Sequence, residues 1–535
     1  MAALNTQKSV VWEKKVFTVL HAPGLKGLAE GVAKHLGSTL VHCISNMMPM
    51  PSETGLCWDS FPSGDPNLKL RIDAIKGKHV VLLMNHDTAH LFEQLAVLLF
   101  LQRFVVPHPE PEYAAGKWKR TMRDGRYDEC YVASLTVIVP WYRHCQMERT
   151  CRWTVTEQGK WYNGEPHGEF VDVPTAQSFA AMLSSLPIPG SSKCPPQQLL
   201  LVDIHEYEDL QFTLDSTHRW ANKKQEYDYV RGTGTYFTSA FEHFLSRVHG
   251  PSLEAVGSAF VVFPDNGAHA RFYTMVHTSL KGVPLENILW INKSRVGTDI
   301  TQTDALHYID ANGREQQRTS GFANGARILI ADDFTNSGGA CSPSHRTARM
   351  HKHTAHTPPT RLLYPQPRRS ETRPAHAMYA GTLFGAAEIV RGKAAPGAKL
   401  HVSCFVSHFV ATYSKDKVAK FVEKLYAPNA PLDEFNCTDS IPNVVQWLTD
   451  ELDSRVAKGA PRKAKVMTIA PVLAEWVTSH PLGPPYAKPR PSFARPRGLT
   501  PSGRRRYMNG VGLRTTAVLV LGAVALGVAL GRRMR

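Results

Sequence analysis

The run 326–339 constrains the fold more than any other part of this chain. Residues 328–331 are apolar and largely β-branched, which predicts a buried parallel strand, and Asp332 and Asp333 follow directly. A small glycine-rich turn comes next, yet a helical pattern resumes only at 382–390. Paired carboxylates can hold the cis hydroxyls of a ribose, and the N–H groups of such a turn can cradle a phosphate. The run therefore suggests a site for a ribose phosphate.

Further short apolar runs predict strands along most of the chain, and helical patterns such as 88–104 lie between them. This alternation predicts an α/β fold with parallel sheets flanked by helices. Several strands end in polar residues, where open α/β sheets bind ligands. A polar loop is expected over 293–325. The other predicted strands are 79–84, 135–140, 198–205, 259–267, 288–295 and 401–406.

The net charge of +16 does not indicate a nucleic-acid-binding protein, because of where it lies. Residues 340–381 carry +6 and residues 477–535 carry +11, which leaves −1 for the rest of the chain. Nine cysteines without any Cys-x-x-Cys pair argue against a zinc ribbon and suit a reducing compartment. A cytoplasmic or organellar location is expected.

The C-terminal region has two parts of different composition. Residues 477–514 are rich in Pro and Arg and predict a disordered basic linker. Residues 515–531 are uncharged apart from their flanks, which makes them a candidate membrane segment. As a helix, however, they fall short of the roughly 30 Å hydrocarbon core. A weak membrane anchor and a surface helix or spurious tail are left as alternatives.

Seven segments, in order along the chain, resemble those of the ribose-phosphate pyrophosphokinases, also called phosphoribosyl pyrophosphate synthetases. The divergent plant-type class is the most similar. This resemblance covers residues 60–476. The segments are 92–97, 139–142 with Arg149, 202–205, 263–268 with Arg271, 293–295, 332–339 joined to Thr382, and 435–442.

The resemblance implies two tandem phosphoribosyltransferase-like domains, at 1–215 and 216–476. It also implies transfer of the diphosphoryl group of ATP to the 1-hydroxyl of ribose 5-phosphate, with Mg²⁺ as cofactor, in a homo-oligomer. Lys293 and Arg295 would be catalytic, and Arg149 would bind ATP. Metal ligands would be Asp203, His205, Asp215 and Asp265. Ribose 5-phosphate would be bound by Asp332, Asp333, Thr335, Asn336, Ser337, Gly338, Gly339 and Thr382.

The segment 340–381 departs from the family pattern, because it splits the predicted phosphate loop between Gly339 and Thr382. It holds six Arg and five His and lacks hydrophobic periodicity, so it cannot form a core element. Three explanations compete: a translated intron, a tolerated insertion, or a subunit that has lost catalysis. Two other functions are therefore considered, a non-catalytic regulatory subunit associated with the synthetase and a phosphoribosyltransferase.

Overall fold

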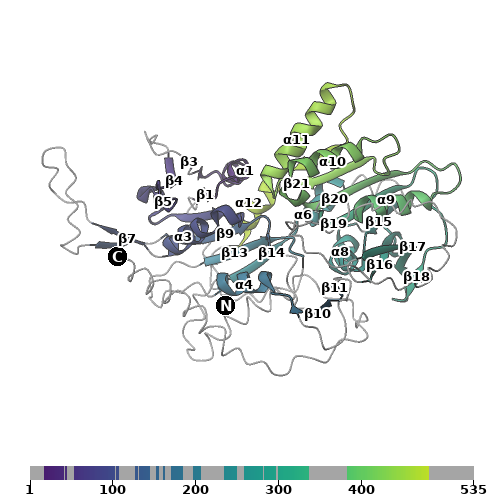
Figure 1. Ribbon diagram of the computed structural model, residues 1–535, viewed down its shortest axis with the longest axis horizontal. Coiled ribbons are helices and arrows are strands. Elements are labelled where there is room, and N and C mark those ends of the chain that lie inside the picture. Colours follow the sequence, from purple (N-terminus) through teal and green to yellow (C-terminus); the bar gives the residue numbers. More distant parts are fainter. Residues whose placement is uncertain are drawn as a thin grey trace, which may run out of the picture. The chain divides into compact units, whose positions relative to one another are not determined.

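The structure, a computed structural model, places fifteen stretches of the chain, and its elements are labelled in Figure 1. Both main sheets belong to one compact unit, Met1–Arg490; the second unit, Pro491–Arg535, lies outside the described residues. The described residues are 17–40, 42–44, 54–102, 104–107, 127–130, 132–144, 152–155, 161–162, 170–184, 197–205, 234–249, 258–280, 282–296, 299–335 and 382–480.

The first sheet has six strands in the order β14-β13-β9-β6-β1-β2, and all neighbouring pairs are parallel. Its central strands are mainly apolar and buried along almost their whole length, as expected for a sheet covered on both faces. The strands are β1 (Phe17–His21), β2 (Thr39–Leu40), β6 (His79–Leu83), β9 (Ser134–Val139), β13 (Gln197–Val202) and β14 (Gly234–Thr238).

Helices and small sheets lie along the chain between these strands. The helices are α1 (Lys26–Leu36), α2 (Ile72–Ile75), η1 (Thr88–His90), α3 (Leu91–Gln102), α4 (Thr175–Ser184) and α6 (Ala240–His243), with the π-helix η3 (Phe244–His249). The short strands are β3 (His42–Ile44), β4 (Thr54–Ser60), β5 (Pro66–Leu70), β7 (Phe104–Pro107), β8 (Tyr127–Cys130), β10 (Arg152–Val155), β11 (Trp161–Tyr162) and β12 (Phe170–Val171).

The second sheet has eight strands in the order β18-β17-β16-β15-β19-β20-β21-β22. The strands are β15 (Ala259–Phe263), β16 (Ile288–Val296), β17 (Asp299–Ile309), β18 (Glu315–Gln317), β19 (Arg327–Thr335), β20 (His401–Phe409), β21 (Glu434–Thr438) and β22 (Ala464–Met467). The helices are α8 (Asn266–Ser279), η4 (Leu285–Asn287), α9 (Thr382–Gly392), η5 (Ala411–Tyr413), α10 (Lys415–Leu425), α11 (Pro442–Ala457) and α12 (Ala470–Ser479). The α/β class with parallel sheets and helices is confirmed.

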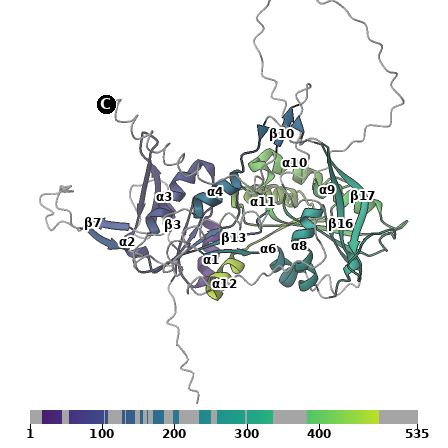
Figure 2. The ribbon, with the colours of Figure 1, turned by 90° about the horizontal axis from the view of Figure 1, so that it is seen from below.

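The prediction of a polar loop over 293–325 was wrong. Strands β16 and β17 form a long antiparallel hairpin, to which β18 adds a third strand (Figure 2). The sequence hides this hairpin because Lys, Arg, Thr and Asp interrupt the apolar pattern on both strands. Asp332 and Asp333 were expected to follow their strand but lie within β19, which pairs with β20 as far as Thr335.

Two elements cross the predicted boundaries. Strand β14 belongs to the first sheet although it lies beyond residue 215, and α12 continues to Ser479, past the predicted start of the linker at 477. Helix α12 lies beside α1 in both ribbon views. The contact is close, since a Cβ atom built on Gly31 would lie 2.7 Å from the Cβ of Ala470. The first sheet's helical layer therefore includes the last described helix, and the two-domain division stays a prediction.

No helix among the described residues has both the length and the apolar composition needed to cross a membrane. The candidate membrane segment 515–531 and the greater part of the predicted linker lie outside those residues.

Candidate functional site

Strand β19 carries the two carboxylates at the centre of the second sheet. Asp333 is buried, and its Oδ2 lies 2.7 Å from Nη1 of Arg271, which projects from α8. The backbone N–H of Asp333 donates a 3.0 Å hydrogen bond to Oδ1 of Asp332. The structure therefore pairs one of the two predicted ribose ligands with a cation that the sequence analysis did not assign to the site.

Asp332 and Asp333 have different ionisation. Burial, together with the charges of Asp333 and Asp265, raises the pKa of Asp332 well above its ordinary value. Burial would also raise the pKa of Asp333, but Arg271 and His205 outweigh it and leave that pKa below its usual range. A side-chain hydrogen bond joins the two carboxyls. One neutral and one charged carboxyl can together both donate to and accept from the hydroxyls of a diol.

Asp265, a predicted metal ligand, lies at the start of α8. Its Oδ1 accepts a 2.9 Å hydrogen bond from the backbone N–H of Ala268 and so caps the helix. Its charge also reaches Asp332. The structure thus places Asp265 at the carboxyl ends of the strands, the same edge of the sheet at which the β19 carboxylates lie. At least one oxygen of the Asp265 carboxylate is engaged in capping α8.

Asp203, another predicted metal ligand, accepts hydrogen bonds from the protein at one carboxylate oxygen. It follows β13 with a left-handed φ of 34° and is buried. Its Oδ2 accepts hydrogen bonds from the backbone N–H groups of Ala240 (2.9 Å) and Phe241 (3.3 Å) and from Oγ of Ser407 (2.6 Å). Burial raises the pKa of Asp203, and these hydrogen bonds oppose that rise. Asp203 therefore holds the turn after β13 through Oδ2, and its role as a metal ligand stays a prediction.

His408, on β20, reinforces the same turn. Its Nε2 lies 3.2 Å from the carbonyl oxygens of both Val202 and Asp203, and its Nδ1 lies 2.8 Å from Oγ of Ser440. Carbonyl oxygens only accept, so Nε2 carries the proton. The turn after β13 in the first sheet is thereby tied to strand ends of the second sheet. His205 follows in this turn, with its ring 5.5 Å from that of Phe334.

Other predicted site residues are placed less completely. Lys293 and Arg295 lie two residues apart on β16, opposite Gln302 and Ile300 of β17, and Thr382 begins α9. Thr335 is buried at the end of β19. The remaining candidates lie outside the described residues: Arg149, Asp215, Asn336, Ser337, Gly338 and Gly339.

Within the described stretches, no group of three or more His, Cys, Asp or Glu side chains is arranged to hold a metal ion. The carboxylate of Asp265 is nevertheless a donor of the right kind for Mg²⁺, and it lies close enough to Asp332 to affect the ionisation of that residue. Mg²⁺ usually keeps several waters and needs only one or two carboxylates. The residues present therefore fit a partly hydrated Mg²⁺ better than a cage of protein ligands.

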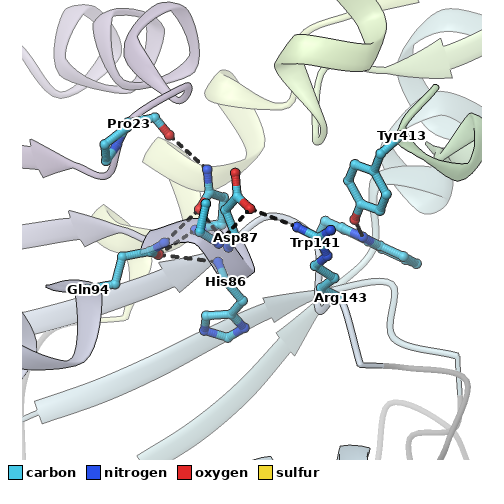
Figure 3. Close-up of polar contacts among 9 residues, drawn as sticks. Pro23, His86, Asp87, Gln94, Trp141, Arg143 and Tyr413 are labelled. Atoms are coloured by element: carbon cyan, nitrogen blue, oxygen red, sulfur yellow. Dashed lines mark hydrogen bonds and ion pairs between the residues drawn. The ribbon is translucent and has the colours of Figure 1, made fainter. Parts of the chain in front are cut away.

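A second polar cluster follows strands of the first sheet (Figure 3). After β6, Asn85 Nδ2 donates to the carbonyl oxygen of Pro23 (2.8 Å), and Gln94 Oε1 accepts from the backbone N–H groups of Asn85 (3.1 Å) and His86 (3.2 Å). Asp87 pairs with Arg143, which follows β9, at 3.0 Å. These contacts tie together the loops after β1, β6 and β9.

The same cluster reaches the loop after β20 through Tyr413. The guanidinium carbon of Arg143 lies 4.1 Å from the centre of the Tyr413 ring, and Trp141 Nε1 donates a 2.6 Å hydrogen bond to the Tyr413 hydroxyl (Figure 3). Ala411, Thr412 and Tyr413 all have positive φ, between 44° and 52°. Such backbone costs of order 1–3 kcal/mol per residue, and it persists only where surrounding contacts enforce it.

His86 gives this cluster a testable acid sensitivity. Its ring is fully buried beside Phe179 and Tyr142, and neither ring nitrogen has a hydrogen-bond partner among the described residues. Burial, assisted by His144, lowers the pKa of His86 from 6.5 to about 3. As the pH falls below 6.5 the unfolded chain takes up a proton at this ring that the native protein refuses, so stability is lost.

The expected loss between pH 7 and pH 5 is about 2 kcal/mol of unfolding free energy from this group. His86→Phe keeps an aromatic ring at this position and removes the titration, so its unfolding free energy should fall less over the same range. Denaturant unfolding of both proteins at the two pH values measures the difference. An equal loss in both would show that His86 does not set this sensitivity.

Arg271, Ser407, His408 and Tyr413 were not predicted as functional residues. Arg271 stands in a segment that drew attention, six residues after Asp265, where one and a half helical turns bring it over β19. Ser407 and His408 follow directly on the predicted strand 401–406, which was a weak signal. Nothing in the sequence pattern marks Tyr413.

Comparison with known proteins does not identify a family for this chain. No protein-family profile matches the chain, and no curated protein sequence matches it either. Among solved structures, the crystal structure of phosphoribosylpyrophosphate synthetase from Mycobacterium smegmatis is similar, with a TM-score of 0.46 and 17% sequence identity. The match covers 87% of this chain and 98% of that one. A similarity this distant does not establish the family.

Proposed function

We propose that this protein is a ribose-phosphate diphosphokinase, which transfers the diphosphoryl group of ATP to the 1-hydroxyl of ribose 5-phosphate and yields phosphoribosyl pyrophosphate. The observation that carries the proposal is the carboxyl pair on β19, with Arg271 on one carboxylate and His205 and Asp265 close enough to affect the ionisation of the pair. These residues come from three separate motifs of the sequence. Their grouping at one sheet edge suits a sugar phosphate better than a structural ion pair alone.

The sugar would be held by the two carboxyls in complementary roles. Charged Asp333, fixed by Arg271, accepts a hydrogen bond from one ribose hydroxyl. Asp332, whose pKa is raised, can donate a proton to the other and accept from it. The 5-phosphate would meet the turn 336–339 and the start of α9, where helix N–H groups favour an anion.

Transfer of the diphosphoryl group depends mainly on positioning and on neutralising charge. Lys293 and Arg295 would supply cations to the phosphate oxygens, and Arg149 would bind ATP. Mg²⁺ or its waters would be held by Asp203, His205, Asp215 and Asp265, and Oδ2 of Asp203 would also keep the His205 turn in place. Bound Mg²⁺ would neutralise part of the charge on the ATP phosphates.

The sugar site is tested by Asp333→Asn. The amide cannot replace the charged acceptor, so the KM for ribose 5-phosphate should rise about tenfold or more, equivalent to one charge-assisted hydrogen bond of roughly 1.5 kcal/mol. Initial-rate kinetics with ATP in excess measure it.

Asp433→Asn is the matched control. Asp433 also pairs with an arginine, Arg391 at 2.6 Å, but it precedes β21 at the opposite end of the same sheet. This variant should leave the KM for ribose 5-phosphate unchanged. An unchanged KM in Asp333→Asn, or equal rises in both variants, would move the sugar site away from β19.

A further inference from the structure

The hairpin β16–β17 contains an irregularity directly beside Lys293. The pairing of the two strands is regular up to Ile291 and Leu306 and resumes at Lys293 and Gln302. Between these two pairs, β16 has the single residue Asn292, whereas β17 has the three residues 303–305. The extra residues form a bulge in β17, and Asn292 lies opposite it. Bulges bend a strand and re-aim the residues beyond them. The conformation at Asn292 therefore sets the orientation of the outer half of the hairpin, residues 293–296 and 299–302.

Asn292 is held by three hydrogen bonds at this point. Its Oδ1 accepts from Nε1 of Trp290 at 3.2 Å, and its Nδ2 lies 2.9 Å from Nε2 of His307. Its backbone carbonyl accepts from Oγ1 of Thr303, within the bulge, at 3.2 Å. On the far side of His307, Nδ1 lies 2.9 Å from Oε1 of Glu315 on β18. A chain of polar contacts thus crosses all three strands.

The hydrogen bonds from Trp290 through Asn292 and His307 to Glu315 allow only one assignment of donors and acceptors. The Glu315 carboxylate accepts, so Nδ1 of His307 carries a proton, and in the neutral ring Nε2 must then accept. The Asn292 amide has to present its NH₂ group to His307 and its oxygen to the indole N–H of Trp290. If the Asn292 amide were turned round, its oxygen would face the acceptor Nε2 of His307 and its NH₂ group would face the indole N–H of Trp290, so neither hydrogen bond could form. The side chain of Asn292 therefore has a single favourable orientation.

Trp290 anchors this chain to the body of the sheet. Its side chain is buried, and its ring centre lies 4.2 Å from that of His269 on α8, which is buried too. The opposite end, Glu315, is more than half exposed. The polar chain therefore runs from the packed interface between α8 and the sheet to the outer strand, and Asn292 is its central link.

We infer that Asn292 is a positioning residue that fixes the outer half of the β16–β17 hairpin and thereby the position of Lys293 and Arg295 at the reacting phosphates. This inference rests on the proposed function for its catalytic part. Its structural part, that Asn292 holds the bulge, stands independently. A misplacement of about 1 Å at a catalytic group can cost as much as 10²-fold in rate, so a residue without substrate contact can act strongly in this way.

Three variants of the full chain test the inference. Asn292→Leu has a similar volume but makes neither side-chain hydrogen bond. Asn292→Asp can still accept from Trp290 and can accept from a protonated His307, so it keeps the hydrogen bonds that link Trp290 to His307. Asp310→Ala is the control: it loosens the turn before β18, where Asp310 accepts from the N–H groups of Asn312 and Arg314, without touching Asn292.

Two readouts are needed, amide hydrogen exchange over 293–296 and 299–302 and steady-state formation of phosphoribosyl pyrophosphate. Asn292→Leu should speed exchange there about tenfold and lower kcat about 10- to 100-fold, with the KM for ribose 5-phosphate within twofold of the original. Asn292→Asp should recover most of the kcat. Asp310→Ala should match the original protein in both readouts.

Three results would overturn the inference: unchanged exchange in Asn292→Leu, faster exchange with an unchanged kcat, or an equal loss of kcat in Asp310→Ala. Absence of product both from the original protein and from the form in which Gly339 is joined directly to Thr382 would instead refute the proposed function and, with it, the catalytic part of the inference. Hydrogen exchange would still decide whether Asn292 holds the bulge.

Discussion

Lys293→Ala is expected to lower kcat by at least about 10²-fold while the KM for ribose 5-phosphate changes little. The ammonium group would neutralise charge that builds up on the phosphate oxygens in the transition state, whereas the sugar is held elsewhere, by the carboxyls of β19. The measurement is steady-state kinetics with purified protein in which Gly339 is joined directly to Thr382, so that the predicted phosphate loop is continuous.

Lys465→Ala provides a control for the loss of a lysine on the same sheet. Lys465 lies on β22 near the amino ends of the strands, where its largely exposed side chain pairs with Glu434 at 2.8 Å. Its removal should change kcat by less than twofold, in line with the small energies of exposed ion pairs. A Lys293→Ala variant with nearly full kcat would remove Lys293 from the mechanism.

Removing residues 340–381 is expected to raise activity about 10²-fold or more. The 5-phosphate has to meet the N–H groups of 336–339 and the hydroxyl of Thr382 together, and each charge-assisted hydrogen bond is worth roughly 1.5–3 kcal/mol. The loss of two such bonds corresponds to at least about 10²-fold in binding. In the structure β19 ends at Thr335 and α9 begins at Thr382, so the segment interrupts the connection at this point.

The comparison requires the 535-residue protein and the shortened form assayed side by side for ATP-dependent formation of phosphoribosyl pyrophosphate. A third form, lacking only 491–535, controls for the removal of a basic segment, because it deletes a comparable length far along the sequence from the loop. It should have the activity of the full chain. Equal activity in all three forms would show that 340–381 loops out harmlessly and would leave the intron explanation without biochemical support.

The sequence was a good guide to the strands because burial on both faces imposes a local pattern. The runs at β6, β9, β13 and β15 are short, apolar and bounded by polar residues, and each predicted strand was found. The helix after the split loop was also found, since 382–390 has a clear helical period and α9 spans Thr382–Gly392. These elements are specified by residues near one another in the chain.

The hairpin and the polar contacts between strand ends could not be predicted in the same way. The partner of β16 is set by cross-strand pairing with β17, whose sequence Asp-Ile-Thr-Gln-Thr-Asp is mostly polar. Such pairing depends on a neighbouring strand rather than on a local period.

Asp203 shows the same limit for function. The resemblance implied that Asp203 and His205 are metal ligands, but it could not show that Ser407, 204 residues further along the chain, donates a hydrogen bond to Oδ2 of Asp203. Likewise, Arg271 became a candidate only when α8 was seen to hold it against Asp333. Contacts between residues so distant in the chain leave no periodic signal in a single sequence.

The most direct test of the proposed function is the fate of the terminal phosphates of ATP. Purified protein is incubated with ribose 5-phosphate, Mg²⁺ and ATP labelled in its γ-phosphoryl group, and the products are separated. Diphosphoryl transfer predicts AMP and labelled phosphoribosyl pyrophosphate in equal amounts, and neither should form without ribose 5-phosphate. Label found in inorganic phosphate together with ADP, or ATP left unchanged by the form in which Gly339 is joined to Thr382, would contradict the proposal.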